Sequence, residues 1–439
     1  MPRIAVSGFR PSRWLTGLWR NPDFVKLWGS LTITHFGGQI TFLALPLTAA
    51  LLLNASPLEV GILTAMGALP YPIFGLLAGV LVDRVSKLPV IVAADIARGL
   101  ALLTIPVSAW FGVLTIPLLY IVNFFVGLAS VIGWPAYQVF MTERVGRANL
   151  VEANAKIGVA DSAAQLVGPG IAGALIQWLT APFAIFVDAT TFFVSAWMLR
   201  GIPARETDPP KGRRRSVGRE IHEGLRAIWK NPVLRALVWS IGAWQMFRHA
   251  FVAIVVIFGA RVLGFSAGHV GLLFMTAGLG SLMAAGVTQR LNKRYGMGPT
   301  MLGGMAGSGL AWLLVACAMG PSWLASALFG GGLFLLDLTA MVFFINYLSL
   351  RQAATPDHLL GRVTATMICL TVASAPLGGF GGGWIAEHIG LRSAMALLGL
   401  GPLALVPLVA WLSPLGLVRE LPEPKEPAIT ESLAEEATY

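Results

Sequence analysis

The sequence has little charge for its length and almost no cysteine. Only 12% of its 439 residues are charged, about half of the share that a soluble domain carries, whereas 56% are hydrophobic. So few charged side chains cannot cover a core of this size in water. Cys317 and Cys369 both lie in apolar runs and are too few for a disulfide framework. No metal-ligand spacing surrounds them, so we expect no bound metal and no cofactor.

What the sequence has instead is a series of long apolar stretches. A helix that spans a membrane needs about 20 mostly apolar residues. Twelve such stretches are present, and we number them as spans one to twelve. They cover residues 27–53, 58–82, 88–111, 114–138, 153–178, 181–200, 233–260, 267–289, 298–319, 323–349, 360–386 and 393–416. The expected fold class is therefore an all-α membrane protein with 12 transmembrane helices.

The positions of the basic residues predict the orientation in the membrane. Among the 31 Lys and Arg residues, Arg98 and Arg248 lie inside spans, and Arg261 and Arg392 lie in loops after odd-numbered spans. All the others lie in the terminal segments or beside the loops after even-numbered spans. Because basic residues stay on the cytoplasmic side, we expect both termini to be cytoplasmic, in the inner membrane of a bacterium. The net charge of +10 then reflects topology, and no nucleic-acid partner is expected.

An internal repeat divides the chain into two halves. An offset of 210 residues superposes several pairs of landmarks: Asn21-Pro22 on Asn231-Pro232, Val60-Gly61 on Val270-Gly271, Arg84 on Arg294, Gly168 on Gly378 and Gly173 on Gly383. Because each copy would hold six spans, the two copies should be parallel six-helix bundles with a cavity between them. The expected organisation is a first bundle (27–200) and a second bundle (233–416), joined by a basic cytoplasmic linker (201–232). A cytoplasmic tail (1–26), which lacks the apolar core of a signal peptide, precedes them, and an acidic cytoplasmic tail (417–439) follows them. The linker is expected to be solvated and to touch anionic lipid headgroups.

Several motifs resemble those of a known family of transporters. The segment from Gly79 to Lys87, GVLVDRVSK, resembles the signature G-x-L-x-D-R-x-G-R of the major facilitator superfamily, with a serine in place of the second glycine. The segment from Gly168 to Gly173, GPGIAG, resembles the G-P-x-x-G-G pattern of exporters. The segments GRANL (146–150) and LGR (360–362) resemble the branch that holds the enterobactin exporter and macrolide efflux proteins.

This resemblance implies the major facilitator fold and roles for two groups of residues. In the family, the first motif acts as a gate between the cytoplasmic ends of the bundles, which here assigns that role to Gly79, Asp83, Arg84 and Lys87. The span-five motif, with Gly168, Pro169 and Gly173, would allow a kink or close packing. A purely topological role for the basic residues of the first motif, and simple helix packing for the second, remain alternatives.

The most informative residues are polar groups inside spans. A charge near the bilayer centre costs at least ~2.5–3.5 kcal/mol, so each one needs a partner, water or a function. Arg248 lies about 20 Å along its helix from Arg235 and from Arg261, which is too far for its side chain to reach the membrane surface. Gln245, Arg248 and His249 share one face of span seven. The 210-residue offset places His35 and Gln39 of span one on Gln245 and His249. The resemblance implies that both spans line the central cavity.

Spans five and ten add further candidates for proton coupling and substrate contact. Asp161 and Gln165 lie one turn apart in span five, and Asp337 and Asn346 lie in span ten. A carboxylate or histidine in such a place can be made to titrate near neutral pH. As alternatives, Arg248 could form a structural ion pair with Asp337 or Asp161, and the two histidines could be hydrogen-bonded packing residues.

Two other charged groups in the first half are expected to be structural. Asp95 and Arg98, three residues apart in span three, should form a local pair. Asp188 in span six should pack against Thr190 and Thr191.

Together these features predict a monomeric secondary active transporter that works by alternating access. We expect proton-driven export of a small amphipathic molecule such as a drug, a macrolide or a siderophore. An importer or uniporter of an anionic solute bound by Arg248 is the main alternative. An ATP-driven pump would need a G-x-x-x-x-G-K-[ST] motif, which is absent. An intramembrane enzyme would need a cluster of nucleophile, base or metal ligands, and a receptor would favour a large soluble domain, so we expect no enzymatic activity.

Overall fold

The computed structural model describes residues 17–203, 217–356 and 359–420, and within these parts every regular element is a helix. Twelve of the helices, or pairs of consecutive helices, are long and apolar enough to cross a membrane. The predicted all-α fold with 12 transmembrane helices is therefore confirmed.

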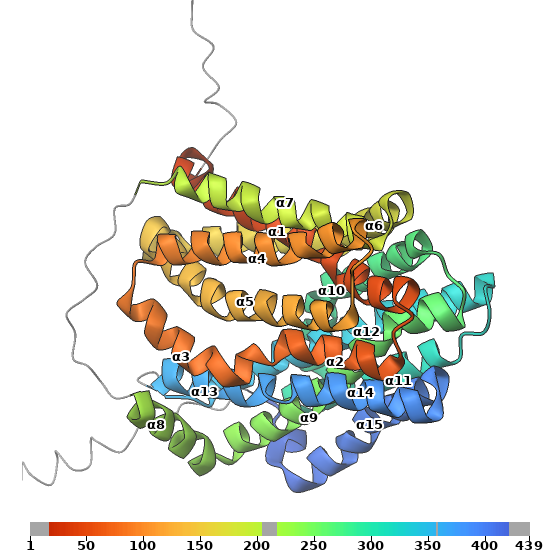
Figure 1. Cartoon of the computed structure of the whole chain (residues 1–439). Coiled ribbons are helices and arrows are strands. Elements are labelled where there is room, and N and C mark those ends of the chain that lie inside the picture. Colours follow the sequence, from red (N-terminus) through yellow and green to blue (C-terminus); the bar gives the residue numbers. More distant parts are fainter. Residues whose placement is uncertain (1–16, 204–216, 357–358, 421–439) are drawn as a thin grey trace, which may run out of the picture.

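The first six spans form one bundle, shown in red to yellow-green in Figure 1. A 3₁₀ turn, η1 (Gly17–Arg20), precedes them, and a π-helical turn, η2 (Thr48–Leu52), extends the first. The second span is divided at Leu69, just before a proline. The helices are α1 (Pro22–Leu47), α2 (Pro57–Ala68), α3 (Pro70–Arg84), α4 (Lys87–Trp110), α5 (Ile116–Val145), α6 (Leu150–Leu179) and α7 (Ala181–Arg200).

The last six spans form the second bundle, shown in green to blue. A second π-helical turn, η4 (Phe258–Val262), extends the first of them, and a 3₁₀ turn, η6 (Pro414–Leu417), follows the last. The helices are α9 (Pro232–Ile257), α10 (Ala267–Tyr295), α11 (Met297–Ala316), α12 (Trp323–Ala353), α13 (Leu360–Val372), α14 (Ala375–Ile389) and α15 (Leu391–Leu412).

The helix bounds repeat at the 210-residue offset found in the sequence. Five helices of the second bundle (α9, α10, α11, α13 and α15) begin 210 residues after their counterparts, and the two π-helical turns match at both ends. The local cause is visible at the first helix of each bundle. The side chain of Asn21 accepts hydrogen bonds from two backbone N–H groups of α1, and Asn231 does the same for α9. A proline follows each cap, where its missing N–H costs nothing.

Three segments differ from the sequence-based expectation. The first helix begins at Pro22, five residues before the expected span, because Asn21 and Pro22 form a helix start. Within the expected solvated linker, residues 217–230 form an amphipathic helix, α8 (Val217–Lys230). It packs on α13 at Gly224, where a Cβ atom would lie 3.1 Å from the carbonyl oxygen of Arg362, and through an ion pair of 2.5 Å between Glu223 and Arg362. The start of the expected acidic tail also packs, since Gly298 N–H donates to the carbonyl of Val418.

The two bundles lie side by side with their helices roughly aligned (Figure 1). We call the end at which α1 and α9 begin the terminal end, because both ends of the described chain lie there. The opposite end, with η2 and η4, is the far end. The halves of spans two and eleven meet between the bundles: α2 lies against α14 at the far end, and α3 lies near α13.

Candidate functional site

A cavity of about 540 Å³ lies between the bundles, which is large enough for a drug-sized molecule. Helices α1 and α6 of the first bundle and α9, α10 and α12 of the second bundle contribute its walls. Six residues that the sequence singled out line it: the polar residues Gln39, Gln165, Arg248, His249 and Asp337, and Pro169 of the span-five motif. The structure thus brings together polar groups that are up to about 300 positions apart in the chain.

Most of the cavity wall is apolar and partly aromatic. Phe42 from α1 and Phe274 from α10 meet edge to face across the two bundles, with ring centroids 5.8 Å apart. Phe251, Val255 and Leu336 also line the cavity. A few polar groups in an otherwise apolar wall suit an amphipathic ligand, which buries its apolar body and directs its polar groups to fixed partners.

Arg248 and Asp337 both line the cavity, but no ion pair joins them. Among the described residues no carboxylate lies within ion-pair distance of Arg248. Its guanidinium carbon is 6.0 Å from the ring centroid of Trp244. The alternative of a structural ion pair with Asp337 or Asp161 is therefore not realised in this conformation. Both charges remain available to a ligand, to water or to each other in another state.

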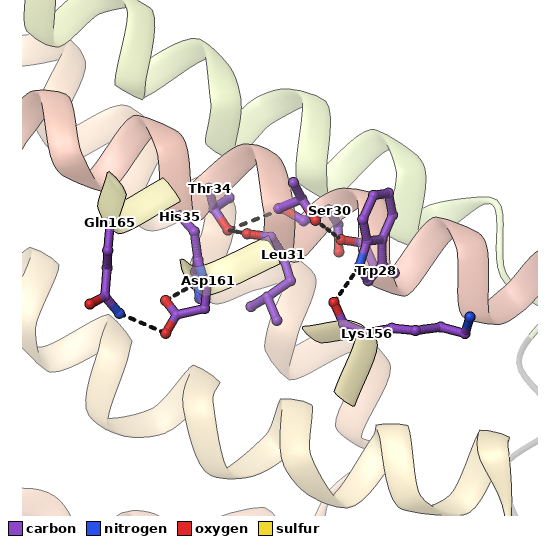
Figure 2. Close-up of polar contacts among 9 residues, drawn as sticks. Trp28, Ser30, Leu31, Thr34, His35, Lys156, Asp161 and Gln165 are labelled. Atoms are coloured by element: carbon purple, nitrogen blue, oxygen red, sulfur yellow. Dashed lines mark hydrogen bonds and ion pairs between the residues drawn. The ribbon is translucent and has the colours of Figure 1, made fainter. Parts of the chain in front are cut away.

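His35, Asp161 and Gln165 form a polar cluster between α1 and α6 (Figure 2). Nδ1 of His35 lies 3.1 Å from Oδ1 of Asp161, and Nε2 of Gln165 donates to Oδ2 of the same carboxylate at 2.7 Å. The contact with His35 is a close approach and not a well-aligned hydrogen bond. The Asp161 side chain is 44% exposed, so water can reach it. The sequence presented His35 and Asp161 as separate candidates, and the structure makes them a pair.

His249 bonds within its own helix. Its Nδ1 lies 2.9 Å from the backbone carbonyl of Gln245, which can only accept, so Nδ1 carries the proton and Nε2 is left as the acceptor of the neutral ring. Gln245 thus contributes its backbone to the site, and its side chain does not line the cavity.

Asn346 lies outside the cavity. It is fully buried between α10 and α12, where its Oδ1 accepts from Nδ2 of Asn292 at 2.8 Å and its own Nδ2 donates to the carbonyl of Val342. The sequence placed it on a cavity-lining span but could not show which face of the helix it occupies. The structure gives it a role in helix packing.

The span-five motif supports close packing. A Cβ atom on Gly168 would lie 2.6 Å from Cγ of Gln39, and one on Gly173 would lie 2.7 Å from the carbonyl oxygen of Ala267 in the other bundle. Helix α6 continues unbroken through Pro169. The packing alternative therefore has direct geometric support.

The residues of the expected gate motif lie at the turn between α3 and α4. Gly79, Asp83 and Arg84 belong to the last turns of α3, and Lys87 begins α4, where its side chain is buried. The side chain of Asp83 and the surroundings of Gly79 lie outside the described part of the structure. Their gating role stays a prediction.

The two groups expected to be structural are partnered inside the first bundle. Asp95 lies 3.3 Å from Arg98 and accepts a hydrogen bond of 2.6 Å from Ser195, which confirms the local pair. Asp188 accepts from Thr191, as expected, and from Thr41 of α1, which the sequence could not indicate.

The bundles touch closely at the far end through backbone contacts at glycines. A Cβ atom on Gly61 would lie 2.6 Å from the carbonyl oxygen of Gly379, and one on Gly271 would lie 2.3 Å from that of Pro169. These two contacts, α2 with α14 and α10 with α6, are equivalent under the 210-residue offset. No side chain larger than hydrogen fits at either glycine without moving the helices apart.

Towards the terminal end, α6 and α10 separate. By helical spacing, Gly158 and Gly286 continue the faces that touch at the far end. A Cβ atom on either glycine would meet no atom within 4 Å, and Leu282 is 51% exposed. The cavity is therefore closed at the far end and opens towards the terminal end between these two helices.

A family model described as Major Facilitator Superfamily matches residues 27–372. The chain belongs to the major facilitator superfamily. Among its relatives, the multidrug efflux pump Tap of Mycolicibacterium fortuitum is 28% identical, over 91% of this chain and 97% of the relative. The enterobactin exporter EntS of Citrobacter koseri is 25% identical, over 70% of this chain and 73% of the relative. The resemblance drawn from the motifs is thereby confirmed at the level of the superfamily and of its efflux members.

Solved structures of the superfamily share the fold. The nucleoside transporter NupG superposes with a TM-score of 0.71 at 14% identity, covering 89% of this chain and 99% of that one. A bacterial homologue of the iron transporter ferroportin in an inward-facing state gives 0.70 at 17% identity, covering 90% and 98%. The chain is thus a multi-pass membrane transporter by family.

The glycine contact between α10 and α6 leads to a stability prediction. Gly271→Leu should lower the free energy of unfolding by about 1–3 kcal/mol, because the new side chain collides with the backbone of α6 and overpacks the contact. Gly286→Leu is the matched control, since it makes the same substitution on the same helix face into open space. Thermal unfolding in detergent micelles would measure both. Equal losses in the two variants would show that the close approach at Gly271 contributes nothing.

Proposed function

We propose that the protein is a proton-coupled exporter of a small amphipathic molecule, such as a drug, a macrolide or a siderophore. The observation that carries the proposal is the position of Gln165. Its side chain lines the central cavity and also donates to Asp161, which is paired with His35. One amide thus connects the place where a substrate would bind with a group that can take up a proton. The efflux function named for Tap and EntS supports the direction of transport.

The proposed orientation places the terminal end in the cytoplasm. It rests on the concentration of Lys and Arg at that end, since membrane proteins keep basic residues on the cytoplasmic side. In a bacterium this corresponds to the inner membrane. The opening between α6 and α10 would then admit substrate from the cytoplasm or from the inner leaflet, which is the loading step of an exporter.

Competition for Gln165 offers a physical basis for coupling between proton and substrate. An ionised Asp161 holds the amide of Gln165 and attracts a protonated His35. When Asp161 takes up a proton, both interactions weaken, because a neutral carboxyl is the poorer acceptor and no longer attracts the imidazolium. A substrate that draws the Gln165 side chain into the cavity changes the same balance. Proton and substrate would therefore alter each other's affinity, and thermodynamic linkage makes that effect reciprocal.

The proposed transporter needs neither a partner subunit nor a cofactor. Both bundles and all five cavity helices come from one chain, so we propose that it acts as a monomer. The ligands of the proposal are the substrate, protons and the surrounding lipid bilayer. Among the described residues, no group of three or more His, Cys, Asp or Glu could hold a metal ion.

Asp161→Asn tests the proton site directly. In proteoliposomes with an imposed pH gradient and a panel of dyes, macrolides and siderophores, the variant should lose gradient-driven transport and keep passive exchange of the same substrate. Asparagine keeps the size and the hydrogen-bond acceptor but cannot exchange a proton. Asp23→Asn is the control, since that carboxylate pairs with Arg144 at the terminal end, away from the cavity. His249→Gln and Asp337→Asn, tested separately, decide between the other candidates. Normal proton-coupled transport in all three variants would contradict the site assignment.

A second candidate function is favoured by the unpaired state of Arg248. A guanidinium in an apolar cavity, with no carboxylate partner among the described residues, can bind an anionic solute, as an importer or uniporter would require.

Arg248→Gln separates the two functions. If the anion is the substrate, the variant should lose uptake of carboxylate or phosphate compounds, and uptake by the parent should not depend on the pH gradient. If the proposed export holds, gradient dependence in the parent is kept and Arg248→Gln alters only the affinity for substrates that carry an acidic group.

A further inference from the structure

Two charged side chains of the second bundle reach across the far end to helix ends of the first bundle. Nη1 of Arg261, in η4, donates to the carbonyl of Ala55 at 2.7 Å, and its Nη2 donates to the carbonyl of Ala50. The carboxylate of Glu387, near the end of α14, accepts from the backbone N–H of Leu58 at 3.2 Å. Ala50 and Ala55 belong to the connection between α1 and α2, and Leu58 lies in the first turn of α2, so all of these contacts join the two bundles.

The contacts at Ala50 and Leu58 match the sign of the helix ends that they meet, whereas the carbonyl of Ala55 lies in the loop between them. The last carbonyls of a helix have no partner within the helix and carry partial negative charge, which attracts a cation. In the turn after η2, backbone donors take the carbonyls of Thr48 and Ala49. The guanidinium of Arg261 takes that of Ala50. Leu58 lies in the first turn of α2, where free N–H groups attract an anion such as the carboxylate of Glu387.

The 210-residue repeat does not reproduce these charged contacts from the first bundle to the second. The 210-residue offset places Leu51 at the position of Arg261, and Leu51 is 54% exposed. It places Gln177 at the position of Glu387, which keeps a polar group there without its charge. The charged contacts therefore occur on one side of the far end only. The glycine contacts occur on both sides.

A matched arginine lies nearby without joining the bundles. Nη1 of Arg392, at the start of α15, donates to the carbonyl of Ala316 at the end of α11, at 2.9 Å. The chemistry is the same as for Arg261, an arginine on the last turn of a helix at the far end, but both partners belong to the second bundle. Arg261 and Arg392 are also the two basic residues that the sequence predicts to lie in loops at this end.

We propose that Arg261, supported by Glu387, is the latch that holds the far end closed, and that it must release before the cavity can open there. The inference rests on the proposed alternating access. The glycine contacts allow the bundles to approach, but they involve no charged group. The contacts of Arg261 exist only when its guanidinium is within reach of the turn between α1 and α2. Removing them lowers the stability of the closed state and leaves each bundle intact.

Distance measurements across the far end test the latch. Spin labels at Phe111→Cys and Met319→Cys report on opposite bundles, and both native side chains are exposed, at 72% and 70%. Cys317→Ser and Cys369→Ser remove the native thiols. With the full chain in lipid nanodiscs, Arg261→Gln should raise the ratio of long to short distances by about twofold to fivefold, as expected for the loss of an exposed charge-assisted contact. Arg392→Gln should leave the ratio unchanged.

The outcomes distinguish the latch from the proposed function. An unchanged distance distribution in Arg261→Gln, or an equal change in Arg392→Gln, overturns the latch whatever the transport assay shows. The conservative variant Arg261→Lys keeps the positive charge, so it should give a ratio between those of the parent and Arg261→Gln, and a ratio above that of Arg261→Gln would also overturn the proposal. Absence of gradient-driven transport in the parent protein, by contrast, overturns the proposed export and is measured without these labels.

Discussion

The close backbone contact of two bundles at the far end is the constraint on which the rest of this structure depends. Lipid tails are as apolar as leucine, so apolar helices in a bilayer gain little from mere burial and associate through close packing and polar contacts. Gly61 and Gly271 supply that packing, because a Cβ atom on either would collide with the facing backbone. With the far end closed in this way, the bundles diverge towards the terminal end, and the cavity opens there.

The cavity holds charged groups inside the membrane, where each charge without a partner costs free energy. Charges that are kept at such a cost indicate a function. Arg248 and Asp337 face the same space without an ion pair, whereas Asp161 is held by His35 and Gln165 in the other bundle. A transporter needs such groups to be incompletely satisfied, since a fully paired site has no reason to bind a ligand or a proton. Asp95 and Arg98, by contrast, pair with each other inside the first bundle and have a structural role.

Much of the fold could be predicted from the sequence, because its signals are local or periodic. Apolar length predicts the 12 spans, and the landmark Asn21-Pro22 recurs at Asn231-Pro232 where helices begin. The cavity was predictable only in part. Asn346 shares a span with Asp337, yet helix rotation buries it against Asn292. The pairing of His35 with Asp161, and of Arg261 with the α1–α2 turn, depends on how helices distant in sequence are placed, which no local pattern encodes. The amphipathic helix α8 lay inside a segment whose polarity resembled that of a linker.

Counting the protons exchanged on substrate binding tests the central claim most directly. Calorimetric titration of the purified protein with a transported dye, repeated in buffers of different ionisation enthalpy, reports the number of protons exchanged per ligand. Competition through Gln165 and Asp161 predicts that dye binding changes the number of bound protons, and that this change is lost in Asp161→Asn with dye binding retained. Binding that leaves the number of bound protons unchanged in the parent protein, or that changes it equally in the variant, would contradict the account.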